Sequence, residues 1–270
     1  MEYQHFDCDI RDGAARVSLL GPGNPLLADF TDEFMDLILR LQEDLAVRVI
    51  LISDGDHTFD LQPDLDRISG EVGKTDGFET VAADLELATR VVTLLQECVK
   101  PVITATRGDI RATGLGLFMA GDVRLASSTA SFTAPDLAAG LMPEWGLTFT
   151  LPRLLGPGRA LEFLWSGRTL SAGEAQTMGL VDRVIADDNW EDAVEELLLR
   201  LASLPQPLIH LTKLASQQSG QFDLTSMLSF EFEAQQQCYS SLETAECLKA
   251  WQENRTPVFH APTQPLQDDE

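Results

Sequence analysis

The sequence predicts an α/β fold. Apolar, β-branched runs such as 47–52 and 102–106 are typical of buried strands. Segments such as 30–45 and 81–99 instead repeat apolar residues at helical spacing. The two patterns alternate along the chain, which favours strands and helices packed in layers. The 270 residues, of which 44% are apolar, are enough for one large domain or two small ones with a sizeable core.

The chain begins with a predicted antiparallel hairpin. Its strands, 7–10 and 14–20, flank the turn sequence Arg11-Asp12-Gly13. Further along, residues 69–80 (SGEVGKTDGFET) are polar and contain glycine, so we expect a mobile loop there. The broad apolar stripe of 81–99 then predicts a core helix.

An oxyanion hole is predicted where the strand 102–106 leads into a second, buried helix. The strand ends at Arg107-Gly108, and the small residues Ala112-Thr113-Gly114 open an apolar segment that continues to Ala120. A helix start made of small residues presents free backbone N–H groups and the positive end of the helix dipole. Such a start suits a carbonyl oxygen that gains negative charge during a reaction.

Two carboxylates downstream are candidates for proton transfer. Asp136 and Glu144 each stand among apolar residues and prolines. Acids in such surroundings often act as general acids or bases. Other readings of the same residues remain open: Asp136 as a helix or turn cap, Glu144 as a solvated loop acid.

The chain after residue 156 is predicted to be helical. The expected helices are 158–166, 171–178, 190–201, 207–217 and 225–254. The second opens with a capping box, in which Ser171 is followed three residues later by Glu174. The last is expected to pack through Leu228, Phe232, Cys238, Tyr239 and Leu242.

Charge and composition exclude several classes of partner and site. The formal net charge of −24 repels nucleic acid and anionic membranes. No apolar run approaches the roughly 20 residues that cross a bilayer, and no leader pattern opens the chain, so a cytoplasmic location is expected. The four histidines form no ligand pattern and the four cysteines no CxxC pair, so we expect reduced thiols and no metal site.

Several motifs together resemble the crotonase superfamily, the enoyl-CoA hydratases and isomerases. Lys100 to Asp122 aligns with the signature region of that family without a gap. Other pieces are similar to its "CDLRIAS" (Asp122 to Ser127), "PE" (Pro135-Asp136), "LPRLVG" (Leu151 to Gly156) and "TGRxxSAxEAxxxGLVxxVV" (Ser166 to Ala172 and Gly179 to Val184). The order and spacing of these pieces carry the resemblance, which covers roughly residues 10 to 190.

The resemblance implies a crotonase-like ββα spiral core, residues 1–195, followed by a C-terminal helical trimerisation region, 196–262, and a polar tail, 263–270. It also implies a homotrimer or a hexamer. The substrate would be an acyl-CoA or acyl-carrier thioester. Coenzyme A would then be part of the substrate, with no cofactor bound permanently.

The resemblance also assigns the oxyanion hole. Thr113 stands at one donor position, with Gly114 beside it, and both keep their backbone N–H. Pro63 stands at the other donor position and has no N–H, so Asp64 or Gln62 takes that role or half of the hole is missing. Gln62 and Trp145 are the expected substrate-binding side chains.

The acid positions resemble those of the isomerase branch. Gly116 stands where hydratases carry the first of two glutamates that hold water, so the usual two-carboxylate hydration is not expected. Glu144 is the first candidate for a catalytic base, and Asp136 is the second. We expect Trp145 and Met142 to raise the pKa of Glu144 by excluding water from it.

Three functions remain open on the sequence. The first is double-bond isomerisation of an acyl thioester by oxyanion-stabilised proton transfer. The second is a carrier-protein-linked dehydratase or decarboxylase of polyketide β-branching, because the run from Arg107-Gly108 to Gly116 also resembles those enzymes. The third is a non-catalytic crotonase-fold subunit, because Pro63, Thr113 and Gly116 depart from the catalytic pattern together.

Overall fold

A computed structural model of the chain describes residues 3–20, 27–54, 60–61, 65–135 and 137–259. The larger of its two sheets has the strand order β1-β2-β3-β5-β7-β10. Its strands are β1 (Phe6–Arg11), β2 (Ala14–Leu19), β3 (Val49–Ser53), β5 (Val102–Thr106), β7 (Val123–Ser127) and β10 (Arg183–Ile185). β1 and β2 pair antiparallel, and every later neighbour pair is parallel. The parallel strands therefore end at one common edge.

The smaller sheet has the order β4-β6-β8-β9. Its strands are β4 (Asp60–Leu61), β6 (Asp109–Arg111), β8 (Ser131–Thr133) and β9 (Thr169–Ser171). β4, β6 and β8 follow β3, β5 and β7 in turn, so each turn of the chain adds one strand to each sheet. This is the spiral expected from the resemblance.

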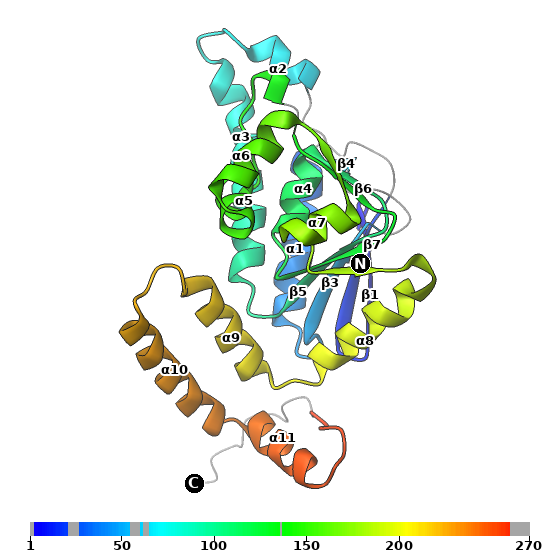
Figure 1. Cartoon of the computed structure of the whole chain (residues 1–270), viewed down its shortest axis with the longest axis vertical. Coiled ribbons are helices and arrows are strands. Elements are labelled where there is room, and N and C mark those ends of the chain that lie inside the picture. Colours follow the sequence, from blue (N-terminus) through cyan, green and yellow to red (C-terminus); the bar gives the residue numbers. More distant parts are fainter. Residues whose placement is uncertain (1–2, 21–26, 55–59, 62–64, 136, 260–270) are drawn as a thin grey trace, which may run out of the picture.

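Helices cover both sheets and form the C-terminal part of the chain. They are α1 (Leu27–Glu43), α2 (Leu65–Glu71), α3 (Gly77–Glu97), α4 (Ala112–Met119), α5 (Leu147–Leu155), α6 (Pro157–Ser166), α7 (Ala172–Met178), α8 (Trp190–Ala202), α9 (Gln206–Gln218), α10 (Leu224–Tyr239) and α11 (Leu242–Gln252). Two 3-10 turns, Leu137–Ala139 and Asp187–Asn189, precede α5 and α8. In Figure 1, α9, α10 and α11 extend from the body that holds the sheets, and α2 lies at the opposite end.

The two faces of the larger sheet bury separate clusters, because side chains alternate along a strand. On β3, Ile50 and Ile52 belong to the cluster shared with α1, α3 and α4. Val49 and Leu51, which alternate with them in the sequence, pack with α8. This double burial explains why β3 is a continuous apolar run in the sequence.

Most elements expected from the sequence are confirmed. The N-terminal hairpin turns at Asp12 and Gly13, both with positive φ (50° and 77°), as a tight two-residue hairpin requires. Residues 69–80 are not a loop throughout, since α2 continues to Glu71 and α3 begins at Gly77. Sequence reasoning missed these helix ends because their residues are polar and lack apolar periodicity.

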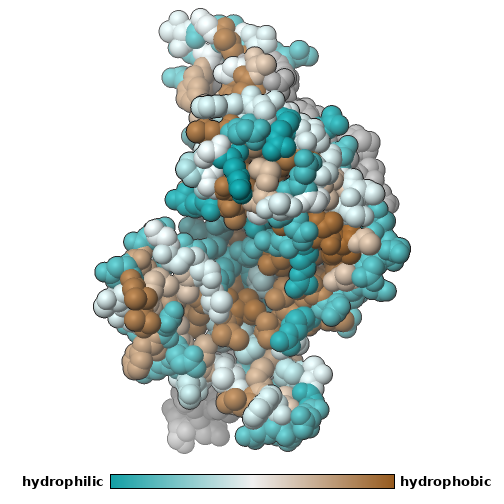
Figure 2. Space-filling model, viewed as in Figure 1, coloured by the Kyte–Doolittle hydropathy of each residue, from teal (hydrophilic) through white to brown (hydrophobic). Residues whose placement is uncertain are grey.

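The single long helix expected at 225–254 is wrong. The chain breaks at Ser240 and Ser241, and the extended backbone of Ser241 (φ −85°, ψ 132°) starts α11. Of the five residues expected to pack, Cys238 is buried and the other four are exposed, Phe232 by 76%. Figure 2 shows apolar side chains at the surface of α10. The expected packing side therefore faces away from the chain's own core.

Ion pairs join the C-terminal helices to the body. Lys213 of α9 contacts Asp122 at 2.8 Å, with the lysine side chain 9% exposed. Arg48, just before β3, forms a two-pronged contact with Glu243 of α11 at 2.8 and 2.9 Å. The expected limit between core and C-terminal region, 195/196, falls inside α8, which packs on β2 and β3. No helix among the described residues has the length and apolarity to cross a membrane.

Candidate functional site

The helix α4 stands where the sequence predicts an oxyanion hole. β5 ends at the common edge of the parallel strands, β6 follows, and α4 begins directly after Arg111. Thr113 and Gly114 occupy the first turn of α4, whose backbone N–H groups have no acceptor within the helix. Both residues are buried, so these donors lie in a water-poor part of the molecule. A carbonyl oxygen bound there would feel the N–H groups strongly.

Gly116, one turn along α4, lies directly against Trp145. A Cβ atom added at Gly116 would lie 2.1 Å from the Cβ of Trp145 and 3.1 Å from its Cγ and carbonyl oxygen. Real carbon atoms approach to about 3.5 Å. Position 116 therefore excludes every side chain while Trp145 keeps its place. The absent glutamate and the tryptophan, which are 29 positions apart in the sequence, are parts of one packing arrangement.

Trp145 holds an unusual backbone conformation. Its φ of 54° is left-handed, which costs a non-glycine residue about 1–2 kcal/mol, and Gly146 follows with φ 74°. The side chain is 4% exposed within the main core cluster. Its indole Nε1 is buried and has no hydrogen-bond partner among the described residues. A strained backbone and a buried donor without a partner at one residue are typical of functional sites.

Glu144, the first candidate base, directly precedes Trp145. Its side chain is partly exposed, and its carbonyl oxygen accepts the N–H of Leu147 at the start of α5. Met142 is 74% exposed, so it does not shield Glu144 from water as expected. The backbone turn at 145–146 thus lies between α4 and α5, with the partly exposed Glu144 directly before the buried Trp145 that packs on α4.

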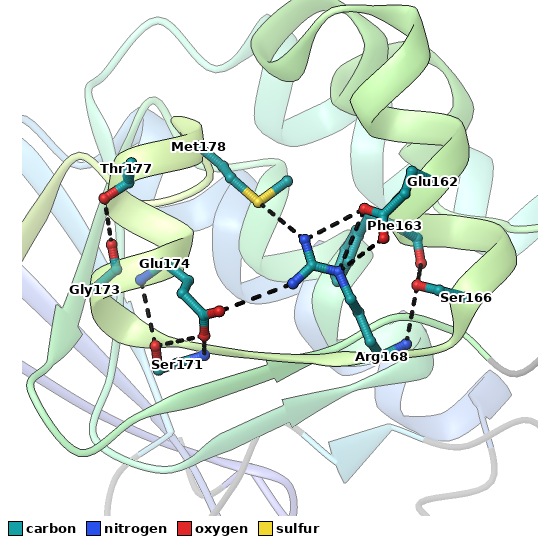
Figure 3. Close-up of polar contacts among 9 residues, drawn as sticks. All are labelled: Glu162, Phe163, Ser166, Arg168, Ser171, Gly173, Glu174, Thr177 and Met178. Carbon is teal, nitrogen blue, oxygen red and sulfur yellow. Dashed lines mark hydrogen bonds and ion pairs between the residues drawn. The ribbon is translucent and has the colours of Figure 1, made fainter.

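Polar contacts around Arg168 connect β9, the strand that pairs with β8, to two helices. Figure 3 shows the contacts around Arg168, which precedes β9. Its guanidinium binds Glu162 of α6 at 3.1 Å and lies 4.0 Å from Glu174 of α7. Ser171 and Glu174 form the expected capping box at the start of α7. The arginine thus links both helices to the strand that pairs with β8.

Several predicted site residues lie outside the described residues: Asp136, and with it Gln62, Pro63 and Asp64. The structure brings Thr113, Gly114, Glu144 and Trp145 to one region around α4. The contact between Gly116 and Trp145 was not predicted from the sequence. The only sign of it there is the glycine at position 116. In the part of the chain that is described, no group of three or more His, Cys, Asp or Glu side chains could hold a metal ion.

Comparisons with known proteins cover nearly the whole chain. The family model of the enoyl-CoA hydratases/isomerases matches residues 9–262. A crotonyl-CoA hydratase of Syntrophomonas wolfei is 30% identical over 87% of this chain and 89% of its own length. An enoyl-CoA hydratase/isomerase of Cupriavidus metallidurans has a crystal structure with TM-score 0.84 and 25% identity, covering 98% of this chain and 99% of that one. An enoyl-CoA hydratase of Bacillus anthracis gives TM-score 0.82 and 26% identity, covering 96% and 100%.

Proposed function

Because the chain belongs to the enoyl-CoA hydratase/isomerase family and has the crotonase fold, we propose that it moves a double bond along the acyl chain of a CoA-type thioester. Isomerisation needs one base and a site for the thioester oxygen. Syn-hydration by the usual route needs two carboxylates that hold a water molecule. The described residues around α4 supply one carboxylate, Glu144, and two N–H donors.

One observation carries this proposal: the space that a second glutamate would need at position 116 is filled by Trp145. The 2.1 Å separation between the added Cβ and that of Trp145 leaves no room for an acid there. The loss of the glutamate is therefore built into the packing of α4 against the loop before α5. A tryptophan in that place also removes water from the reacting carbon atoms, which favours proton transfer over water addition.

The mechanism uses backbone donors and a single acid. The N–H groups of Thr113 and Gly114 hold the thioester oxygen and stabilise the negative charge of the dienolate. Glu144 takes a proton from the carbon atom at one end of the allylic system and returns it at the other end. The double bond shifts by one position, and no atom is gained or lost. Asp136 remains the second candidate for this base.

The test is incubation with 3-hexenoyl-CoA while ¹H NMR follows the position of the double bond. We expect 2-hexenoyl-CoA to accumulate, with little 3-hydroxyacyl product. Replacing Glu144 with glutamine should lower this rate about 10²- to 10⁴-fold. The matched control is Glu196→Gln, which alters an exposed acid on α8 and should leave the rate unchanged.

Other outcomes identify the alternatives. Rapid formation of 3-hydroxyhexanoyl-CoA would show hydration and refute the proposal. Activity with a loaded acyl carrier protein but not with free acyl-CoA would indicate the carrier-linked function. Unchanged substrate together with no binding of acyl-CoA by calorimetry would indicate a non-catalytic subunit.

We also propose that the C-terminal helices join copies of this chain into a homotrimer or a hexamer. Phe232 and Trp251 are 76% and 77% exposed, and Leu228 and Leu242 on the same two helices, α10 and α11, are also exposed. Single exposed apolar residues are ordinary, but a run of them over two helices marks an interaction surface. Light scattering after size-exclusion chromatography measures the mass. A monomer at micromolar concentration would refute this assembly.

A further inference from the structure

A buried carboxylate that the proposed mechanism does not use lies at the end of β3. Asp54 is 2% exposed. Its Oδ2 accepts hydrogen bonds from the hydroxyl of Thr106 at 2.5 Å, the N–H of Arg107 at 3.1 Å and the N–H of Gly108 at 3.2 Å. Thr106 is the last residue of β5, and Arg107 and Gly108 form the turn that follows it. One oxygen atom of Asp54 therefore binds both the end of β5 and the turn that follows it.

This carboxylate is held by hydrogen bonds alone among the described residues. Arg107 donates its backbone N–H to Asp54 but directs its guanidinium to Glu191 at 3.3 Å. Burial raises the pKa of Asp54, while the hydrogen bonds from Thr106, Gly108 and Arg107 act to lower it. A buried charge without a cation is costly unless its hydrogen bonds are satisfied. Burying this carboxylate to hold the turn after β5 is energetically unfavourable compared with burying an apolar residue, which indicates that the position of this turn matters.

The turn held by Asp54 leads directly to α4. From Gly108 the chain runs through β6 into α4, where Thr113 and Gly114 present their N–H groups. From Asp54 itself the chain continues to β4, and β4 pairs with β6 through Asp60 and Arg111. The segments that follow β3 and β5 are therefore joined at two places: by the Asp54 carboxylate at the sheet edge and by the pairing of β4 with β6 further along the chain.

We propose that Asp54 is a positioning residue for the oxyanion hole: its carboxylate holds the exits of β3 and β5 in register, so that the N–H groups at the start of α4 point at the thioester oxygen. The inference rests on the proposed function, because it assumes that a thioester binds there. It assigns Asp54 no contact with the substrate. A displacement of about 1 Å at these donors is enough to lower a rate about 10²-fold.

The experiment measures carbonyl polarisation directly. Butyryl-CoA labelled with ¹³C at the thioester carbonyl is saturated and has no double bond to move, and hydrogen bonds to its oxygen shift the ¹³C resonance downfield. The shift of the bound ligand is compared for the full-length protein, Asp54→Ala and Asp54→Asn. Calorimetry gives the affinity, and circular dichroism gives the thermal midpoint.

Asp54→Ala should lose most of the downfield shift and lower kcat for 3-hexenoyl-CoA about 10²-fold, with a smaller change in KM. Asp54→Asn should keep most of the shift, because its amide oxygen can accept the same three hydrogen bonds. The matched control is Asp122→Ala. Asp122 accepts the N–H of Val102 at the opposite end of β5, so its loss should lower thermal stability without altering the ¹³C shift.

The outcomes separate the two proposals. A downfield shift in the unaltered protein that Asp54→Ala leaves intact would overturn the positioning role while the proposed function stands. No downfield shift in the unaltered protein would mean that no oxyanion hole forms, and the proposed function would fail with it. Equal loss of shift in Asp54→Ala and Asp122→Ala would reduce Asp54 to a general stabilising residue and also refute the inference.

Discussion

Replacing Gly116 with alanine adds one methyl group at the point where α4 meets Trp145. The added Cβ would lie 2.1 Å from the Cβ of Trp145, so the two carbon atoms must separate by about 1.4 Å to reach van der Waals contact. Crowding of this kind in a packed core costs about 1–3 kcal/mol. Alanine also favours the helix by about 1 kcal/mol relative to glycine. Because the overlap is with a buried neighbour, we expect crowding to prevail and G116A to lose up to about 2 kcal/mol.

Urea unfolding followed by circular dichroism measures this loss. The informative comparison is a double-mutant cycle with Trp145→Gly, which removes the opposing Cβ and suits the positive φ at position 145. In that background G116A should become neutral or stabilising by up to about 1 kcal/mol. The cycle should therefore report a coupling of about 2 kcal/mol.

A glycine with open space around it provides the control. Gly158 in α6 has no atom within 4 Å of an added Cβ, so G158A should be neutral or slightly stabilising. A G116A variant that behaves like G158A, or that loses the same free energy of unfolding with and without Trp145, would contradict the predicted clash. Should W145G not fold, the difference between G116A and G158A still decides the question.

Three further predictions follow from the contacts of the body and the C-terminal helices. Burial alone would raise the pKa of Glu243, but hydrogen bonds from Arg48 and from the N–H of Gln206 outweigh it, so the pKa lies below its ordinary 4.5. The stabilisation is then complete above pH 4.5 and is lost as pH falls through the lower folded value. Glu243→Gln should lower the free energy of unfolding by about 1–2 kcal/mol at pH 7, and this loss should shrink in acid. Urea unfolding at pH 7 and at pH 3 measures the loss at each pH. An equal loss at both would contradict the prediction. Replacing Phe232 with aspartate should lower the mass measured by light scattering to that of a smaller assembly, whereas Glu233→Gln, an exposed neighbour, should not. Arg168→Lys should change stability by less than about 1 kcal/mol, because its partners Glu162 and Glu174 are more than half exposed; a larger loss in thermal unfolding would show that the contacts of Figure 3 are stronger than surface ion pairs.

Local patterns explain how well the elements could be predicted. The strands β3 and β5 and the helices α1 and α3 follow from periodicity, which depends on neighbouring residues only. The break between α10 and α11 did not follow, because Ser240 and Ser241 are tolerated inside helices and the break depends on where α11 is held by Arg48. The exposure of Phe232 could not be inferred either, since an apolar stripe does not tell whether it packs on its own chain or on another surface.

The sequence alone predicted the strands β3 and β5, the helices α1 and α3, the buried helix with its small-residue start, and the motifs that place the chain in its family. Those features are written in consecutive residues. The tertiary structure decided that Trp145 takes the space of a side chain at Gly116, and that Asp54 fixes the turn after β5. One contact joins residues 116 and 145, and the other joins residues 54 and 107. Both pairs are 29 or more positions apart, and local periodicity and propensity cannot predict contacts over such separations. Close packing makes them specific, because a buried site of fixed volume admits either the tryptophan or an acid.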